Sequence, residues 1–440
     1  MLLLLSALLF LLIIISYFFS RRDIISPTFL LSFSFFVVVF IAYMFEKELG
    51  GDIHGHTVAV ILVGILAFNI GEILVRQYFR GRKRVAFRDR QRILIRDKYI
   101  FLMCVFIVVT LYFSYKHFMS ISSLFGVDDP VLAYGAVRSY YVDVSNQKMD
   151  NIVAKNVGLI LLENISYTLI FYSLYVYCYN RFFKGVVKGK LLLPFLIGCP
   201  IYLFQSGGRS AYLQIATCVA SIVFMMIKQT EVVRCEKIKG LVPYLYRVVK
   251  YILLVIFLFL GLGYVRSGEE EMDLVSVVCS YTGSSIIGLD LFLTEYLSRP
   301  LGMMTENSWC EYTFRTLYDF LNRFGFNISL DSYHDEFFRY PVGTSNIYSG
   351  FKYMIEDFSL YGMFFVMFLL GIVYTLFWMC MKYGYLNVYN PLNYWFLSVF
   401  FHTLVMMPLM YSLPGNIMIS TGLILRVFFL YVLRYLCQGR

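Results

Sequence analysis

The sequence is poor in charge and lacks the features that divide a chain into soluble modules. Charged residues make up 15% of its 440 residues, whereas soluble domains carry about 25%. It contains no tandem repeat, no Pro-rich linker and no low-complexity tail. These absences exclude a soluble multidomain protein and predict a single integral membrane domain over residues 1–440.

Paired cysteines are also missing, although the chain has nine cysteines. There is no Cys-x-x-Cys, and most of the cysteines lie within apolar runs. Such cysteines behave as small hydrophobic residues. We therefore expect no disulfide framework, no metal ion and no cofactor.

Apolar runs dominate what is present. Hydrophobic residues make up 59% of the chain, and several runs approach or exceed the ~18 residues that a spanning helix needs. Only helices satisfy their own backbone hydrogen bonds within lipid, so the sequence predicts an all-α polytopic membrane protein with about eleven (ten to twelve) transmembrane helices. Met1–Phe19 lacks a basic leader and a cleavage site, so we expect it to be a retained span. The expected spans are 2–19, 28–45, 57–75, 99–115, 156–180, 191–205, 211–227, 251–265, 359–380, 392–411 and 416–435.

Basic residues cluster on one side of the predicted membrane. Arg76–Lys98 holds ten Lys and Arg residues, and 181–190 and 228–250 add four and six. The positive-inside rule makes these segments cytoplasmic, which puts the N-terminus outside and the C-terminus inside. A basic run beside acidic lipid headgroups explains the net charge of +10, so we expect no nucleic-acid partner.

The longest polar stretch runs from Arg266 to Asp357 and forms a large outer loop in this topology. An apolar run within it, 274–297, is interrupted by Gly283, Asp290 and Glu295. We expect this run to form an interfacial or re-entrant helix that is buried against protein. If it spanned instead, the loop beyond it would become cytoplasmic.

Two arginines stand at predicted outer ends of spans, each close to glycine. Gly207 and Gly208 precede Arg209, and Arg266 follows Gly263. Backbone N–H groups at a helix start and a guanidinium together suit a pyrophosphate. The alternative for Arg209 is a hairpin turn with a snorkelling side chain, and for Arg266 an interface anchor.

The large loop also supplies candidate bases for a reacting hydroxyl. His334 stands between Asp331, Asp335 and Glu336, and Asp357 closes the loop. A solvated charge cluster is the alternative. Asp128–Asp129 could bind a metal, although a turn or helix cap suits it better. Glu163 and Arg426 both fall in the outer half of a span, and we predict that they pair.

Three stretches resemble the Wzy-type O-antigen polymerases, which are oligosaccharide repeat-unit polymerases of bacterial envelopes. They are Gln205-Ser-Gly-Gly-Arg-Ser-Ala-Tyr212, Cys279-Ser-Tyr-Thr-Gly-Ser-Ser-Ile-Ile-Gly-Leu-Asp290 and 344–362. The last one resembles the family's Asn-x-Tyr and Asp-Phe-Gly pattern, with Ser359 where the family often has Gly. The plan of many spans with one large late outer loop extends the resemblance over the whole chain.

The resemblance implies transfer of a growing glycan from undecaprenyl pyrophosphate to an incoming lipid-linked unit, at the periplasmic face of a bacterial inner membrane. The resemblance assigns Arg209, Asn346, Tyr348 and Asp357, and the residues themselves point to Arg266 and His334. Arg209 and Arg266 would hold the pyrophosphate, and His334 or Asp357 would act as the base. The expected catalytic residues are thus Arg209, Arg266, His334 and Asp357; the expected substrate-binding residues are Gly207, Gly208, Tyr281, Arg339, Asn346 and Tyr348.

Two other functions are the alternatives to polymerisation. An O-antigen ligase shares the plan and the donor, but moves the glycan onto lipid A core. A lipid-linked oligosaccharide flippase would show internal repeats and charges lining the bundle, and neither is evident here. The expected partners are the lipid-linked donor and acceptor, membrane lipid and a chain-length regulator.

Overall fold

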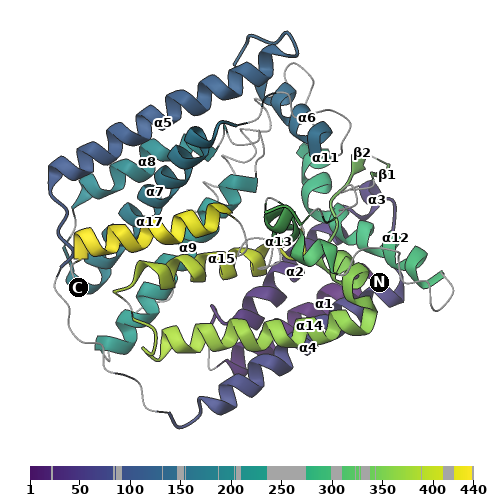
Figure 1. Cartoon of the computed structure of the whole chain (residues 1–440). Coiled ribbons are helices and arrows are strands. Elements are labelled where there is room, and N and C mark those ends of the chain that lie inside the picture. Colours follow the sequence, from purple (N-terminus) through teal and green to yellow (C-terminus); the bar gives the residue numbers. More distant parts are fainter. Residues whose placement is uncertain are drawn as a thin grey trace. The chain divides into compact units, whose positions relative to one another are not determined.

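The computed structural model is predominantly helical (Figure 1). It describes residues 1–20, 23–82, 85, 92–130, 132–145, 153, 155–186, 188–202, 204, 210–234, 274–298, 310–322, 324–326, 328, 337–341, 343–387, 389–409 and 421–438. Within these ranges, six helices are long and apolar enough to span a membrane. They indicate a membrane-embedded protein, as the sequence predicted. The predicted span 251–265 lies outside the described residues.

Contacts between residues divide the chain into two compact units, which are described separately. The first unit comprises Met1–Lys83, Met272–Cys380 and Val399–Ser420. The second comprises Arg84–Glu271, Met381–Ser398 and Thr421–Arg440. Two late helices, α14 (Gly350–Lys382) and α15 (Pro391–Met406), contribute residues to both units.

Three of the spanning-length helices, and all but the last two residues of a fourth, belong to the first unit. They are α1 (Leu2–Phe19), α2 (Pro27–Met44), α4 (Gly55–Tyr78) and α14, with the short α3 (Glu46–Leu49) between α2 and α4. Helix α2 begins where Ser26 accepts a hydrogen bond from the N–H of Phe29 (3.4 Å) and Pro27 takes the first helical position. Proline there removes only an N–H that has no partner within the helix.

The faces of α1 explain why its sequence is apolar all round. Leu2, Leu5 and Leu9 are fully buried, whereas Leu3 and Phe10 are more than half exposed. A helix in water would carry polar residues on its outer face. The outer face of α1 is therefore suited to lipid chains.

In its described residues, the loop predicted at 266–357 contains short helices and a β-hairpin. Residues 274–298 form α11 (Leu274–Val278), the π-helical turn η3 (Cys279–Gly283) and α12 (Ser284–Ser298). Helix α13 (Glu311–Asn322) follows, and β1 (Phe338–Tyr340) pairs antiparallel with β2 (Gly343–Ser345). The buried residues of α12, among them Ile286, Leu289 and Leu293, belong to the core of the first unit. This packing agrees with the prediction that the apolar run lies against protein. The hairpin of β1 and β2 was not predicted.

The second unit contains the other two spanning-length helices, α5 (Asp97–Ser123) and α7 (Val157–Lys184). In Figure 1, α7 lies beside α5, α8 (Leu193–Gly198), α9 (Ser210–Arg234) and α17 (Thr421–Gln438). Helix α6 (Ala133–Ser145) packs on α5, while η1 (Gly189–Leu192) and η2 (Cys199–Tyr202) flank α8. The apolar segment Gly189–Tyr202 is shorter than the roughly 20 residues that a span needs. That 191–205 crosses the membrane therefore stays a prediction.

The prediction that Glu163 pairs with Arg426 is wrong. Both carboxylate oxygens of Glu163 lie 3.0 Å from Nζ of Lys155, and Oε1 also accepts from the Ser114 hydroxyl (3.1 Å). Arg426 instead donates from Nε to Oδ1 of Asn164 (3.0 Å) and lies over the Tyr167 ring. Lys155 lies just before α7, and its side chain extends along the helix to Glu163. The assignment of spans alone did not indicate this partner.

Candidate functional site

The second and third stretches of the resemblance lie together in the first unit. Ser284 of α12 hydrogen-bonds to Ser345 of β2 (Oγ to Oγ, 3.0 Å), and Ser345 also donates to the Ser280 carbonyl (3.2 Å). The N–H of Ser349 donates to the carbonyl of Ser285 (3.3 Å). Hydroxyl and backbone groups of the two stretches thus form hydrogen bonds with each other. Buried polar groups require such partners.

The hydroxyls of Ser280 and Tyr340 complete this network. Burial raises the pKa of the Tyr340 phenol above its usual 10.0, against a smaller lowering by Ser280. The phenol therefore remains protonated at neutral pH and can donate a hydrogen bond. This contact fastens β1 to the π-helical turn, which also carries the half-buried Tyr281.

An aromatic cluster forms where Gly288 lets α12 approach the hairpin. A Cβ on Gly288 would lie 2.8 Å from Cε1 of Phe338 and 3.0 Å from Cδ1 of Tyr348. The Phe338 and Tyr348 rings pack edge to face, with centroids 5.3 Å apart. Tyr348 is buried, so it supports this cluster. A side chain at Gly288 would separate the two stretches.

Lys352 places a cation in this aromatic cluster. The residue is 6% exposed, and its Nζ lies 3.9 Å from the centroid of Tyr348, 5.4 Å from that of Tyr353 and 5.8 Å from that of Phe292. Among the described residues, no carboxylate forms an ion pair with it. Aromatic faces attract a cation, but they compensate a buried charge only in part. Within the part of the chain that the structure describes, the aromatic rings are therefore the groups that surround this cation.

Asp357 holds the start of α13. Its Oδ1 accepts from the N–H of Tyr312 (3.1 Å), its Oδ2 accepts from the N–H of Thr313 (2.6 Å), and the Thr313 hydroxyl donates to Oδ2 as well. The first N–H groups of a helix have no partner within it. Asp357 therefore acts as a cap from another part of the chain, with both carboxylate oxygens occupied.

The backbone of α14 is interrupted two residues later. Ser359 has φ 63° and ψ 174°, a region that is essentially restricted to glycine. The chain turns out of helical geometry at this point, with a non-glycine residue in the turn.

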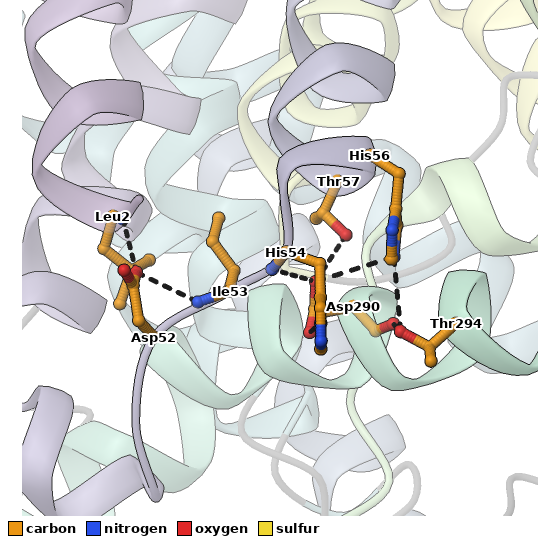
Figure 2. Close-up of polar contacts among 8 residues, drawn as sticks. All are labelled: Leu2, Asp52, Ile53, His54, His56, Thr57, Asp290 and Thr294. Atoms are coloured by element: carbon orange, nitrogen blue, oxygen red, sulfur yellow. Dashed lines mark hydrogen bonds and ion pairs between the residues drawn. The ribbon is translucent and has the colours of Figure 1, made fainter.

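Two histidines and an aspartate meet where α4 begins (Figure 2). Asp290 of α12 is buried, and its Oδ2 lies 2.8 Å from Nδ1 of His54. Its Oδ1 accepts from the N–H of His54 (2.8 Å) and the hydroxyl of Thr57 (2.5 Å), and lies 3.9 Å from Nε2 of His56. Asp290 thus occupies the N-terminus of α4, where a negative charge is favoured.

Asp52 makes a similar contact to the start of α1 (Figure 2). Its carboxylate accepts from the N–H of Leu2 (2.6 Å) and Ile53 (3.0 Å) and pairs with the ammonium of Met1. Partial burial opposes the charge of Asp52. The ammonium and the N–H groups outweigh this effect and hold the pKa of the carboxyl below its ordinary 3.8.

The predicted site residues fall into two groups. Gly207, Gly208, Arg209, Arg266 and His334 lie outside the described residues. The others all belong to the first unit: Tyr281 and Asn346 are half-buried, Tyr348 is buried, Arg339 is exposed on β1, and Asp357 caps α13.

Sequence reasoning missed His54, His56 and Lys352. The His-Gly-His spacing places two of the chain's five histidines within three residues, and this was the signal that could have marked them. The sequence marked Asp290 as an interruption of an apolar run and as the end of a stretch that carries the resemblance, but not as a partner of the histidines. Nothing in the local sequence indicates that Asp290 and His54, 236 positions apart, form a hydrogen bond.

Comparison of the chain with protein-family models, with curated proteins and with solved structures finds no match.

Proposed function

We propose that the protein is a membrane glycosyltransferase that polymerises polyprenyl-pyrophosphate-linked oligosaccharide units at the outer face of a bacterial inner membrane. The proposal starts from the three stretches that resemble the repeat-unit polymerases. It is supported by the six spanning-length helices, which suit an enzyme whose donor and acceptor are both anchored in lipid.

The observation that carries the proposal is the packing of 279–290 against 344–349. These stretches are more than 50 residues apart in the chain, yet Ser284 and Ser345 bond directly and Gly288 fits against Tyr348. Two motifs that serve one function are expected to lie close together. Their hydrogen-bonded contact supports a shared role for these two stretches, both of which belong to the first unit.

The reaction forms one glycosidic bond and breaks one bond to phosphate. The acceptor hydroxyl attacks the anomeric carbon of the donor glycan, and the bond from that carbon to the pyrophosphate oxygen breaks. Arg209 and Arg266 stabilise the charge that develops on the pyrophosphate. We assign the base to His334, which takes the hydroxyl proton, because the carboxylate of Asp357 is occupied at the start of α13.

We also assign a role in substrate binding to Lys352 of the first unit. It lies against Tyr348, which the resemblance assigns to the site, and it lacks an anionic partner among the described residues. A phosphate oxygen of the donor or acceptor supplies the missing charge. Aromatic rings of the same cluster offer apolar faces to the sugars.

The first test is the electrophoretic ladder of the host's surface polysaccharide after deletion of the gene. Collapse to core plus one repeat unit supports polymerisation. Complete loss of attached units favours the ligase or a flippase instead, and an unchanged ladder refutes the proposal. In the complemented strain, Arg209→Ala should keep the protein level and abolish long chains, while single-unit capping persists.

A further inference from the structure

The turn before α4 brings two imidazole rings to one side. His54 precedes the helix in an extended conformation (φ −80°, ψ 158°), and His56 is the second residue of α4. Residues two apart within a helix point in different directions, but the extended backbone at His54 removes that restriction. The two rings stack, with centroids 5.1 Å apart and planes 7° from parallel (Figure 2).

Asp290 reaches the two rings from α12 and completes a compact set of ligand atoms. One nitrogen of each histidine and one carboxylate oxygen of Asp290 all lie within 4.8 Å of one another. Zn²⁺ binds imidazole nitrogen and carboxylate oxygen at about 2.0–2.2 Å, so tetrahedral ligand atoms lie about 3.4 Å apart. His54 is 62% exposed, so rotation of its ring can close the remaining distance without disturbing the core.

We propose that His54, His56 and Asp290 bind a divalent transition-metal ion, with Zn²⁺ as the first candidate. Two imidazoles and one carboxylate form a ligand set that suits zinc. Three protein ligands leave one tetrahedral position open for water or for an oxygen of a bound molecule. The argument for this site does not use the proposed polymerase function, although Asp290 ends one of the stretches that carry the resemblance.

The carboxylate among the three ligands is already oriented by hydrogen bonds, as ligating carboxylates in metal sites are. Thr57 and the N–H of His54 hold Asp290 in place, and the Thr294 hydroxyl donates to the Asp290 carbonyl (2.8 Å). The same hydroxyl lies 3.2 Å from Nε2 of His56, so it can accept from that nitrogen when the nitrogen carries a proton. Metal binding replaces this proton, and the ring keeps the tautomer that is protonated at Nδ1.

The experiment measures zinc in the purified full-length chain. The protein is prepared in detergent with an affinity tag that contains no histidine, stripped with chelator, reloaded with ZnCl₂ and desalted. Elemental analysis compares wild type with the double variant His54→Ala/His56→Ala. The control is His117→Ala, which removes a histidine of α5 in the second unit.

Wild type and His117→Ala should each retain roughly one zinc ion per chain, and the double variant should lose it. X-ray absorption at the zinc edge should show imidazole nitrogen and oxygen, without sulfur. Equal zinc in the double variant, or none in wild type, overturns the proposal and leaves Asp290 as a cap for α4 alone.

Folding is checked separately, because a misfolded variant would also lose metal. The double variant keeps the contacts of Asp290 with Thr57 and with the backbone N–H of residue 54, so it should elute as a single species. Asp290→Asn replaces one carboxylate oxygen of the ligand and should weaken zinc binding by more than about tenfold. Loss of an outer-shell partner alone costs roughly tenfold. Unchanged zinc affinity in this variant would also overturn the proposal.

Discussion

Gly71 of α4 and Gly371 of α14 mark a close crossing of two helices within the first unit. A Cβ on Gly71 would lie 2.4 Å from the carbonyl oxygen of Phe368, and a Cβ on Gly371 would lie 2.1 Å from that of Phe68. The two backbones are therefore in direct contact. Small residues permit such approaches between helices in lipid, where van der Waals packing replaces the hydrophobic effect.

Gly371→Ala should destabilise the protein by about 1–3 kcal/mol, because a methyl group at this position forces the two helices apart. The measurement is the thermal unfolding midpoint in detergent. Gly55→Ala is the matched control in α4, since a Cβ there meets nothing within 4 Å. An equal midpoint for Gly371→Ala and wild type would show that the crossing is looser than described.

Glu163→Gln should cost about 3 kcal/mol, because it leaves the mostly buried ammonium of Lys155 without its partner. The swap Lys155→Glu/Glu163→Lys should restore part of that loss in the same unfolding measurement. The swap Glu163→Arg/Arg426→Glu should restore none. Rescue by the second swap alone would contradict the pairing described for α7.

Asp357→Ala should lower stability by roughly 1 kcal/mol through loss of the helix cap, whereas Asp357→Asn keeps an acceptor oxygen and most of the stability. We expect Asp357→Asn to make a normal polysaccharide ladder, because the proposed base is His334. A stable Asp357→Asn protein that makes no long chains would move the base to Asp357.

Ser359→Gly should stabilise the chain by about 1 kcal/mol, because glycine adopts φ 63° and ψ 174° without the strain that a Cβ brings there. Ser359→Ala is the control: it removes the hydroxyl and keeps the Cβ, so it should give no gain. The unfolding midpoints of the three proteins decide the matter. A lower midpoint for the glycine variant would argue against strain at this residue.

Lys352→Met should abolish long polysaccharide chains without lowering the unfolding midpoint, since an apolar chain of similar length suits the aromatic cluster. Lys352→Arg keeps the charge and should retain part of the activity. Lys47→Met, at an exposed lysine of α3 in the same unit, should leave the ladder unchanged. A normal ladder in Lys352→Met would remove this cation from the proposed site.

Helix positions were largely predictable from the sequence. The predicted spans 2–19, 28–45 and 57–75 agree closely with α1, α2 and α4. Apolar runs of spanning length must form helices in lipid, where each backbone group finds its partner four residues away in the same segment. Local sequence is sufficient for such elements.

The sequence by itself determined a helical membrane protein and the approximate ends of α1, α2 and α4, but not the end of α5 or the start of α14. Only the tertiary structure decided which polar groups meet: Asp290 with His54, Asp357 with Thr313, and Glu163 with Lys155 instead of Arg426. Helix formation depends on hydrogen bonds between near neighbours in the chain. Pairing of buried polar side chains depends on how the helices pack against one another. Two such residues can be far apart in the chain, and neither the hydrophobic periodicity nor a local motif then indicates that they pair.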